Sequence, residues 1–300
     1  MTKTTEALLT IGIPTYNRVD TVRRRIEELL ALDISVEILV IDNASPDDTF
    51  ATLTTSFSHP NLTVLTNRTN LGYSGNLLRL IDEASTPYLL FLSDEDSIDP
   101  AGLETLIAFC REKSPAMVSP QAQVGKQLIY RGRKTTELIR PTEFQSSAFY
   151  ISGVTIDREL ALADVPLIRE LQATNSAASV YPQVLLAALA VARGNSYFLA
   201  AHVTEQQEQL ETTITENSGS DYRSVGARWQ QFLSYEEFFD LDHPSELRVR
   251  MEQMREAQRR AIMPIISARM RIELPALESH LAQASTKLAI STFRNRFRRK

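Results

Sequence analysis

The feature that most constrains this chain is an apolar run that leads into three consecutive acidic residues. Residues 88–92 read Tyr-Leu-Leu-Phe-Leu, and Asp94, Glu95 and Asp96 follow after a single serine. A run without polar alternation is typical of a strand that is covered on both faces. Three unpaired carboxylates are too costly to bury, so we expect them just past the strand's carboxyl end. Open α/β sheets bind ligands at that edge, and clustered carboxylates there favour Mg²⁺ or Mn²⁺. A solvated acidic turn is the alternative for such a triplet taken alone.

The sequence before this run predicts three further strands that alternate with helices. The strands are predicted at residues 8–13, 36–41 and 62–65, with apolar residues at helical spacing between them. This order predicts an α/β fold with a mostly parallel sheet and helices on both faces. The residues after each strand would then converge on one edge, which brings Pro14–Arg18 and Asp42 beside the acids.

The residues at these strand ends suit a nucleotide. Asp42 follows the second strand, where an acid can accept hydrogen bonds from a base or a ribose. Position alone fits a turn or a helix cap equally well. Gly72 and Gly75 follow the third strand and would let the backbone approach a ligand closely. Neither a Gly-x-x-x-x-Gly-Lys loop nor a Gly-x-Gly-x-x-Gly fingerprint is present.

Four of these segments, in this order, resemble glycosyltransferase family 2 over roughly residues 8–110. They are Ile13–Arg18, Val40–Ser45, Asn70–Gly72 with Asn76, and Phe91–Asp96. The resemblance implies a GT-A fold, a nucleoside-diphosphate-sugar donor, a glycan or lipid-linked acceptor, and Mn²⁺ or Mg²⁺. It implies donor-binding roles for Pro14, Thr15, Tyr16, Asn17, Arg18, Asp42, Asn43, Gly72, Asn76, Asp94, Glu95 and Asp96. Asp94 and Asp96 would form the Asp-x-Asp pair, with Asp96 the more direct metal ligand.

The catalytic base is where the chain departs from the family. Many inverting members carry Glu-Asp just before a buried helix, which is predicted here over Tyr181–Arg193 from its proline near the start and Gly194 past the end. Residues 179–182 read Ser-Val-Tyr-Pro instead. In this respect the chain resembles the abequosyltransferase-like branch, which makes bacterial surface polysaccharides. Inversion or retention therefore stays open.

Asp157 and Glu159 are the first candidates for the missing base. A strand is predicted at residues 148–156, where Gly153 would let an acceptor approach the backbone, and the two acids follow it directly. Asp157 could instead cap the helix that comes next. Asp164 and Glu170 are further candidates.

The chain divides into a predicted catalytic domain and a helical extension. We expect a GT-A domain over residues 1–203, with a nucleotide-sugar-binding half at 1–119 and an acceptor-side half at 120–203. The polar segment 204–222 predicts a mobile loop, and residues 223–300 a helical C-terminal extension. The last twenty residues hold six basic side chains and no acidic one, together with Phe293 and Phe297. This pattern suits an anionic membrane surface, although an ordinary basic tail is the alternative.

Composition and net charge bear on the class of ligand and on the cellular compartment of the protein. The formal net charge of −5 opposes general nucleic-acid binding. The single cysteine, Cys110, fits an apolar helical pattern and excludes an internal disulfide, which suits a reducing compartment. The N-terminus lacks a secretion-signal pattern, and no apolar run approaches the ~20 residues that span a bilayer. We expect a cytoplasmic protein, with the basic tail able to hold it on the inner face of the cytoplasmic membrane.

Two other functions fit parts of the pattern. A nucleotidyltransferase would also use a parallel sheet with metal-binding carboxylates, but it would be expected to carry a glycine-rich loop near the first strand. A non-catalytic sugar-nucleotide-binding scaffold agrees with the missing base. The intact Asp42, Asp94 and Asp96 oppose that reading.

Overall fold

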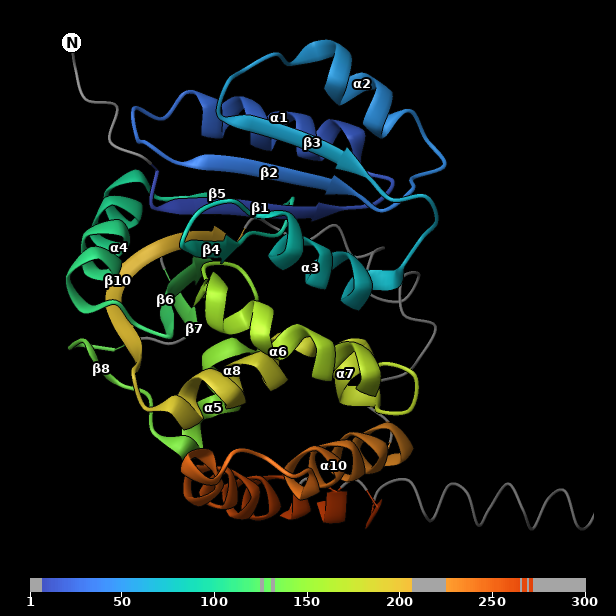
Figure 1. Cartoon of the computed structure of the whole chain (residues 1–300), viewed down its shortest axis with the longest axis vertical. Helices are drawn as coiled ribbons and strands as arrows, with labels where there is room; N and C mark the ends of the chain where they lie inside the picture. The colour runs from blue at the N-terminus through green and yellow to red at the C-terminus, as the bar shows by residue number, and fades with distance from the viewer. Residues whose placement is uncertain are drawn as a thin grey trace, which may run out of the picture.

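A computed structural model describes residues 7–124, 127–130, 133–206, 225–264, 266–268 and 270–271 of the chain. A ten-stranded sheet runs through these residues in the order β3-β2-β1-β4-β9-β6-β10-β5, with β7 and β8 paired to β6 and β10. Figure 1 shows this sheet with helices against it and α10 at the far end of the molecule from β3.

The first half of the chain alternates strands and helices, as the sequence predicts. The four strands are parallel: β1 (Leu9–Thr15), β2 (Glu37–Asp42), β3 (Leu62–Thr66) and β4 (Tyr88–Phe91). The helices between them are α1 (Val19–Leu30), α2 (Thr49–Ser56) and α3 (Gly72–Glu83). Because the strands are parallel, their carboxyl ends lie at one edge of the sheet, and that edge carries the predicted site.

β1, β2 and β4 are buried on both faces, which explains their nearly continuous apolar sequences, whereas the edge strand β3 is partly exposed. Leu89 and Phe91 of β4 belong to one core cluster, together with α3. Tyr88 and Leu90 of the same strand belong to a second cluster, together with α1. The alternation has the period of two that a strand imposes on its side chains.

The second half of the chain extends the sheet with strands of mixed direction. Its strands are β5 (Ser97–Ile98), β6 (Met117–Val124), β7 (Gln127–Tyr130), β8 (Glu137–Leu138), β9 (Thr155–Asp157) and β10 (Ser196–Gln206). Its helices are α4 (Pro100–Lys113), the 3₁₀ turn η1 (Pro141–Glu143), α5 (Phe144–Ala148), α6 (Arg158–Leu171), α7 (Ser176–Val180) and α8 (Pro182–Arg193). β9 is antiparallel to both β4 and β6, whereas β10 is parallel to β6.

Several predicted boundaries differ from the structure. The strand predicted at residues 148–156 is mostly the end of α5 and a loop, and only residues 155–157 form β9. α2 begins at Thr49, and the Asp47 side chain accepts a hydrogen bond from the Thr49 backbone N–H. Residues 204–206, predicted to be loop, belong to β10, where backbone pairing with β6 outweighs their polarity. Residues 207–222 of that predicted loop lie outside the described residues.

α4 packs directly against β10. A Cβ atom on Gly102 would lie only 1.6 Å from the backbone oxygen of His202, so the helix can approach the strand only because this residue has no side chain. Cys110 of the same helix is in the core, as predicted.

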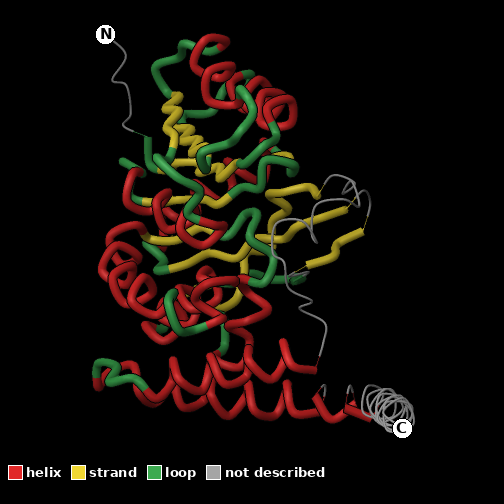
Figure 2. Tube along the Cα trace, turned by 90° about the vertical axis from the view of Figure 1, so that its right-hand side faces the viewer, coloured by secondary structure: helices red, strands yellow, loops and turns green. Residues whose placement is uncertain are grey.

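In the part of the chain that the structure describes, two C-terminal helices pack at the side opposite β3. α10 (Val225–Asp240) is followed by a second helix over residues 245–264, and the two run side by side (Figure 2). Tyr235 and Phe239 of α10 pack edge-to-face on Phe144 at the start of α5.

No helix within the described ranges is long and apolar enough to cross a membrane. The basic tail at 287–300 lies outside those ranges, and its contact with a membrane stays a prediction.

Candidate active site

Asp94 ties the loop after β4 to the loop after β1. Thr15 Oγ1 donates a hydrogen bond to Asp94 Oδ2 at 2.8 Å, and Arg18 Nη1 donates to Asp94 Oδ1 at 2.9 Å. Arg18 also pairs with Glu95 at 3.1 Å. Burial raises the pKa of Asp94, and the Arg18 charge opposes that rise. Both oxygens of Asp94 therefore have protein donors.

Asp96 lies in a different environment, with one oxygen satisfied and one not. Tyr150 Oη and Ser152 Oγ both donate to Asp96 Oδ2. Asp96 Oδ1 is buried and has no hydrogen-bond donor among the described residues. The residue is 1% exposed, and burial raises the pKa of its carboxyl to about 6. An unsatisfied buried carboxylate oxygen is costly unless a cation or a donor meets it.

The Asp96 carboxylate fits a divalent cation. Mg²⁺ in proteins is commonly held by one or two carboxylates, with substrate phosphates and water as the other ligands. No cluster of three or more His, Cys, Asp or Glu side chains suited to a metal occurs in the part of the chain that the structure describes. Asp96 Oδ1 is a carboxylate oxygen that could serve such an ion, and Arg18 holds Asp94 two residues away.

Arg25 of α1 lies beneath the acidic loop and was not singled out from the sequence. It is 1% exposed, forms an ion pair with Glu28, and its Nη2 donates to the backbone oxygen of Glu95 at 3.3 Å. Burial lowers the pKa of Arg25, while the negative charges of Glu28, Asp96 and Asp94 oppose that change. An arginine on the buried face of α1, beside Val22, Ile26 and Leu29, is the signal that could have identified it.

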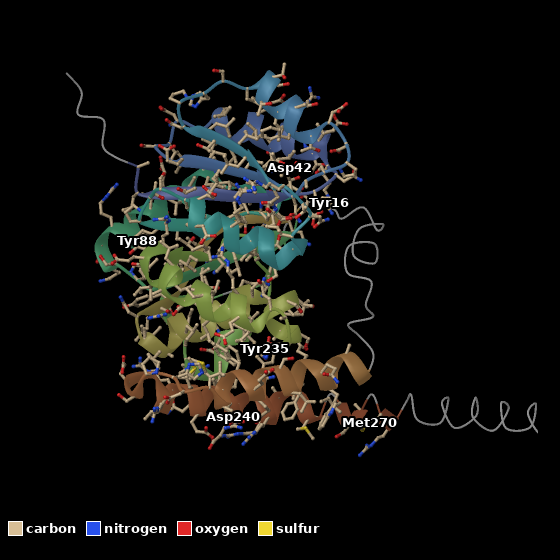
Figure 3. All side chains as sticks on the ribbon, turned by 45° about the vertical axis from the view of Figure 1, so that its right-hand side comes forward. Tyr16, Asp42, Tyr88, Tyr235, Asp240 and Met270 are labelled. Atoms are coloured by element: carbon tan, nitrogen blue, oxygen red, sulfur yellow. The ribbon has the colours of Figure 1, made fainter. Side chains whose placement is uncertain are left out.

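Asp42 holds the loop after β2 in shape. Its Oδ2 accepts hydrogen bonds from the Ser45 backbone N–H at 3.2 Å and from Thr66 Oγ1 at 3.0 Å. The backbone N–H of Asn17 donates to Ser45 Oγ at 2.7 Å, so the loops after β1 and β2 are joined. Asn17 and Ala44 have positive φ angles of 55° and 58°, a strained backbone that is common at ligand sites. Figure 3 shows Tyr16 and Asp42 close together at this end of the sheet.

A set of asparagines fixes the loop between β3 and α3. Asn67 donates to both Asn43 Oδ1 at 2.7 Å and Asn76 Oδ1 at 2.9 Å, and Asn43 Nδ2 donates to Asn70 Oδ1 at 2.8 Å. Gly72 follows with a φ of +70°, which a residue without Cβ adopts most easily. Asn43 and Asn76, predicted to contact the donor, thus hold the backbone of this loop in place.

Asp157 and Glu159 lie toward the opposite end of β4 from the acidic loop, and their role as the base stays a prediction. β9 runs antiparallel to β4, and Asp157 pairs with Tyr88, the first residue of β4, whereas Asp94 follows the last. The Asp157 side chain accepts a hydrogen bond from the Leu160 backbone N–H at 3.0 Å, so it caps α6. Glu159 lies in the first turn of α6. The antiparallel direction of β9, which the sequence does not reveal, places both acids at that end of β4.

Asp164, a further candidate for the base, is held in an ion pair with Arg193. Its two oxygens accept hydrogen bonds from Arg193 at 2.7 and 2.8 Å, which links α6 to α8. Residues 179–182, which stand where many family members have Glu-Asp, lie near the edge of the sheet that carries the acidic loop. Ser74 Oγ of α3 donates a hydrogen bond to the backbone oxygen of Ala178, the residue before them, at 2.7 Å.

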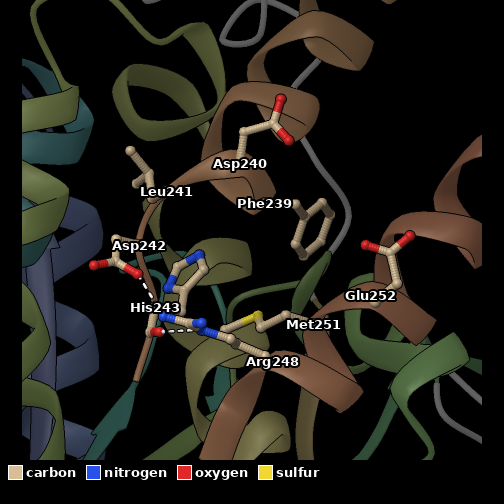
Figure 4. A pocket seen from close by; sticks show the side chains of 8 residues that line it. All are labelled: Phe239, Asp240, Leu241, Asp242, His243, Arg248, Met251 and Glu252. Carbon is tan, nitrogen blue, oxygen red and sulfur yellow. Dashed lines mark hydrogen bonds and ion pairs between the residues drawn. The ribbon is translucent and has the colours of Figure 1, made fainter. Parts of the chain in front are cut away.

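A separate cavity of about 370 Å³ lies at the turn between the two C-terminal helices (Figure 4). Its lining includes His243, whose Nε2 is 2.7 Å from the backbone oxygen of Phe238, and Arg248, which donates to Asp242 at 2.6 Å. Figure 3 shows Asp240, another lining residue, at the opposite end of the molecule from Asp42. The cavity is therefore distinct from the strand-end site.

Comparisons with solved structures identify the same fold in glycosyltransferases. Residues 1–349 of S. aureus TarS, solved with UDP-GlcNAc, match with a TM-score of 0.62 and 17% identity over 82% of this chain and 70% of that one. A second crystal structure of that TarS segment matches with a TM-score of 0.60 and 16% identity over 83% of this chain and 70% of that one. The mannosyltransferase PcManGT from Pyrobaculum calidifontis, solved with GDP-Man and Mn²⁺, gives 0.54 and 14% over 96% and 81%. At these identities the likeness shows a GT-A-like fold.

A comparison with curated protein sequences gives no match. The family model described as "Glycosyl transferase family 2" matches residues 10–169, which is more than half of the chain and includes every strand that ends at the candidate site. The chain belongs to glycosyltransferase family 2.

Proposed function

We propose that this protein is a metal-dependent glycosyltransferase that moves a sugar from a nucleoside diphosphate to an acceptor hydroxyl. The observation that carries the proposal is the buried Asp96 carboxylate, whose Oδ1 has no donor in the described residues, at the edge where β1, β2 and β4 end. The family membership and the nucleotide-sugar complexes of TarS and PcManGT support it.

Asp96 and the residues around it would have different roles in binding the nucleotide-sugar donor. Asp96 would hold Mn²⁺ or Mg²⁺, which supplies charge neutralisation for the departing nucleoside diphosphate when bound. Arg18 and Thr15 orient Asp94 and so fix the turn that carries Asp96. Asp42, with Tyr16 beside it, would contact the base or ribose at the end of β2. Tyr150 and Ser152 hold the Asp96 carboxylate from the side of β9.

The finer assignments belong to the same proposal. The Ser-Val-Tyr-Pro segment at 179–182 supports a place in the abequosyltransferase-like branch, with a hexose or deoxyhexose donor and a bacterial surface glycan or a lipid-linked glycan as acceptor. Cytoplasmic location and contact with an anionic membrane through residues 287–300 rest on the sequence alone.

The test exchanges the metal-binding carboxylate for an amide of the same shape. Asp96→Asn should keep its acceptor oxygen for Tyr150 and Ser152, so the fold and the melting temperature should be preserved. Donor turnover should fall at least about a hundredfold, the size of effect seen when a charge-stabilising group is lost. Calorimetry with UDP and GDP sugars, with and without Mn²⁺, should show metal-dependent binding that the variant loses.

A matched control is Glu104→Gln, which removes an exposed acid from α4. It should bind and turn over the donor as the unaltered chain does. Undiminished turnover by Asp96→Asn, or in excess chelator, would contradict the metal role. Metal-dependent binding without any turnover would instead identify a non-catalytic sugar-nucleotide binder.

A further inference from the structure

Two aromatic side chains, from the segments before β9 and α8, stack on each other, and one of the two rings is half exposed. Phe149 follows α5, and its ring stacks on Tyr181 with 5.8 Å between centroids and 29° between planes. Phe149 is 50% exposed, although one side of its ring faces Tyr181. Tyr181 packs against the core cluster, so the pair is held in place. A large apolar ring that is both fixed and exposed is a feature of ligand-binding surfaces.

The chain ties this pair to the proposed metal ligand. Tyr150, the residue after Phe149, donates its hydroxyl hydrogen bond to Asp96 Oδ2. Tyr181 is held near the same edge because α7, which ends just before it, bonds to α3 through Ser74 and Ala178. Phe149 therefore lies within one residue of a side chain that touches Asp96.

The order of strands places this pair across the acids from Asp42. Along the sheet, β2 carries Asp42, β4 leads into the acids, and β9 follows on the other side of β4. The segment with Phe149 and Tyr150 leads into β9. A nucleotide held at Asp42 would extend its phosphates toward Asp96, so the space beyond Asp96 is where a second substrate must approach.

The chemistry of the surface suits a sugar ring. One face of a pyranose carries C–H groups, which are attracted to the negative face of an aromatic ring, while its rim carries hydroxyl groups. The Phe149 and Tyr181 rings would receive such a face, and the polar atoms of Tyr150 and Ser152 lie toward Asp96. We propose that the Phe149–Tyr181 pair binds a pyranose ring of the acceptor; this inference rests on the proposed glycosyl transfer.

A second aromatic pair lies away from the acidic loop and provides a control. Trp229 and Phe232 of α10 have centroids 5.4 Å apart at 32°, and Trp229 is 38% exposed. They lie on the C-terminal helices, which pack on the side opposite β3 (Figure 1). No contact connects this pair to Asp96 in the described part of the chain. Trp229→Ala is therefore a control that removes an exposed aromatic ring outside the proposed surface.

The experiment measures binding of methyl pyranosides, in which a single sugar ring carries only a methyl group as its aglycone. Saturation-transfer difference NMR would use the methyl glycosides of glucose, galactose, mannose, rhamnose and N-acetylglucosamine, with UDP or GDP and diamagnetic Mg²⁺ and also without nucleotide. At least one glycoside should bind the unaltered chain and the Trp229→Ala variant. Phe149→Ala and Tyr181→Ala should each weaken that binding at least tenfold, whereas Tyr181→Phe, which keeps the ring, should retain it.

Measuring the affinity for UDP and GDP distinguishes failure of this inference from failure of the proposed function. All four variants should bind UDP or GDP with the affinity of the unaltered chain. Absence of glycoside binding, or equal binding by Phe149→Ala and Tyr181→Ala, would overturn the acceptor surface. A loss of nucleotide affinity in those two variants would also overturn it, because the surface would then belong to the donor. Failure of the unaltered chain to bind any nucleotide would instead overturn the proposed function.

Discussion

Asp94 and Asp96 carry the same side chain two residues apart, yet their surroundings give them different tasks. Arg18 and Thr15 satisfy both oxygens of Asp94, whereas Asp96 keeps one oxygen without a donor from the described residues. The triplet motif predicted where the acids lie. It could not predict which oxygen is unsatisfied, because Tyr150 and Ser152 come from a distant segment.

The residue most in need of a direct test is Asp157, since its structural and catalytic roles predict different results. As the cap of α6, it should cost about 1 kcal/mol of stability when replaced by alanine. Asparagine is as good a cap as aspartate, so Asp157→Asn should unfold as the unaltered chain does. Both variants should turn over the donor at the normal rate.

Chemical denaturation and donor turnover, measured on both variants, would decide between the roles. A base would show the reverse pattern, with Asp157→Asn stable but at least about a hundredfold slower. That outcome would mean that Asp157 reaches the reacting atoms despite its place at the other end of β4.

Among the elements, the parallel half of the sheet was predictable and the other half was not. β1, β2 and β4 are apolar runs followed by turn residues, and helical patterns separate them. β5, β8 and β9 are two or three residues long, too short to show any periodicity. Strand direction has no local signature either, because it depends on which neighbour a strand pairs with. The antiparallel direction of β9 places Asp157 and Glu159 toward the opposite end of β4 from Asp94.

The contact between α4 and β10 gives a prediction at this scale. Alanine usually stabilises a helix relative to glycine by up to about 1 kcal/mol. At Gly102 the sign should reverse, because the added Cβ would meet the backbone of His202 and Val203, which cannot rotate away. Gly102→Ala should lower the free energy of unfolding by about 2 kcal/mol or more.

The matched control is Gly226→Ala in α10, where a Cβ would have nothing within 4 Å. It should be neutral or slightly stabilising. Denaturant titration of both variants gives the comparison, and equal effects of the two substitutions would show that α4 does not press on β10 as closely as described.

At the scale of the whole molecule, the C-terminal helices share the core of the catalytic half. Tyr235, Phe238 and Met251 belong to the same buried cluster as Leu77 of α3 and Phe91 of β4. Glu236 also joins the two helices, since it accepts hydrogen bonds from Arg255 and Arg259. The sequence predicts a helical C-terminal extension over residues 223–300, and its described part is helical. Because these helices share the core, we expect the described residues to unfold as one unit.

The only tryptophan of the chain makes this prediction measurable. Trp229 is on α10, so its fluorescence reports the C-terminal helices, while far-UV circular dichroism reports all helices and strands. The two transitions should coincide in denaturant, as expected for a single cooperative unit. Tyr235→Ala, which removes a buried ring, should shift both together by about 3 kcal/mol. An earlier fluorescence transition would show that the helices form a separate domain.

Cys110 has a practical consequence for labelling chemistry. It is the only cysteine in the chain and is 2% exposed, and burial raises the pKa of its thiol to about 12. Near pH 7.5 its reactive thiolate is therefore scarce, on the order of one in ten thousand or less. An added cysteine at an exposed position would be the preferred target of a maleimide dye, with no need to remove the native one. Leu71, which is 49% exposed in the loop before α3, would place such a dye beside the candidate donor site.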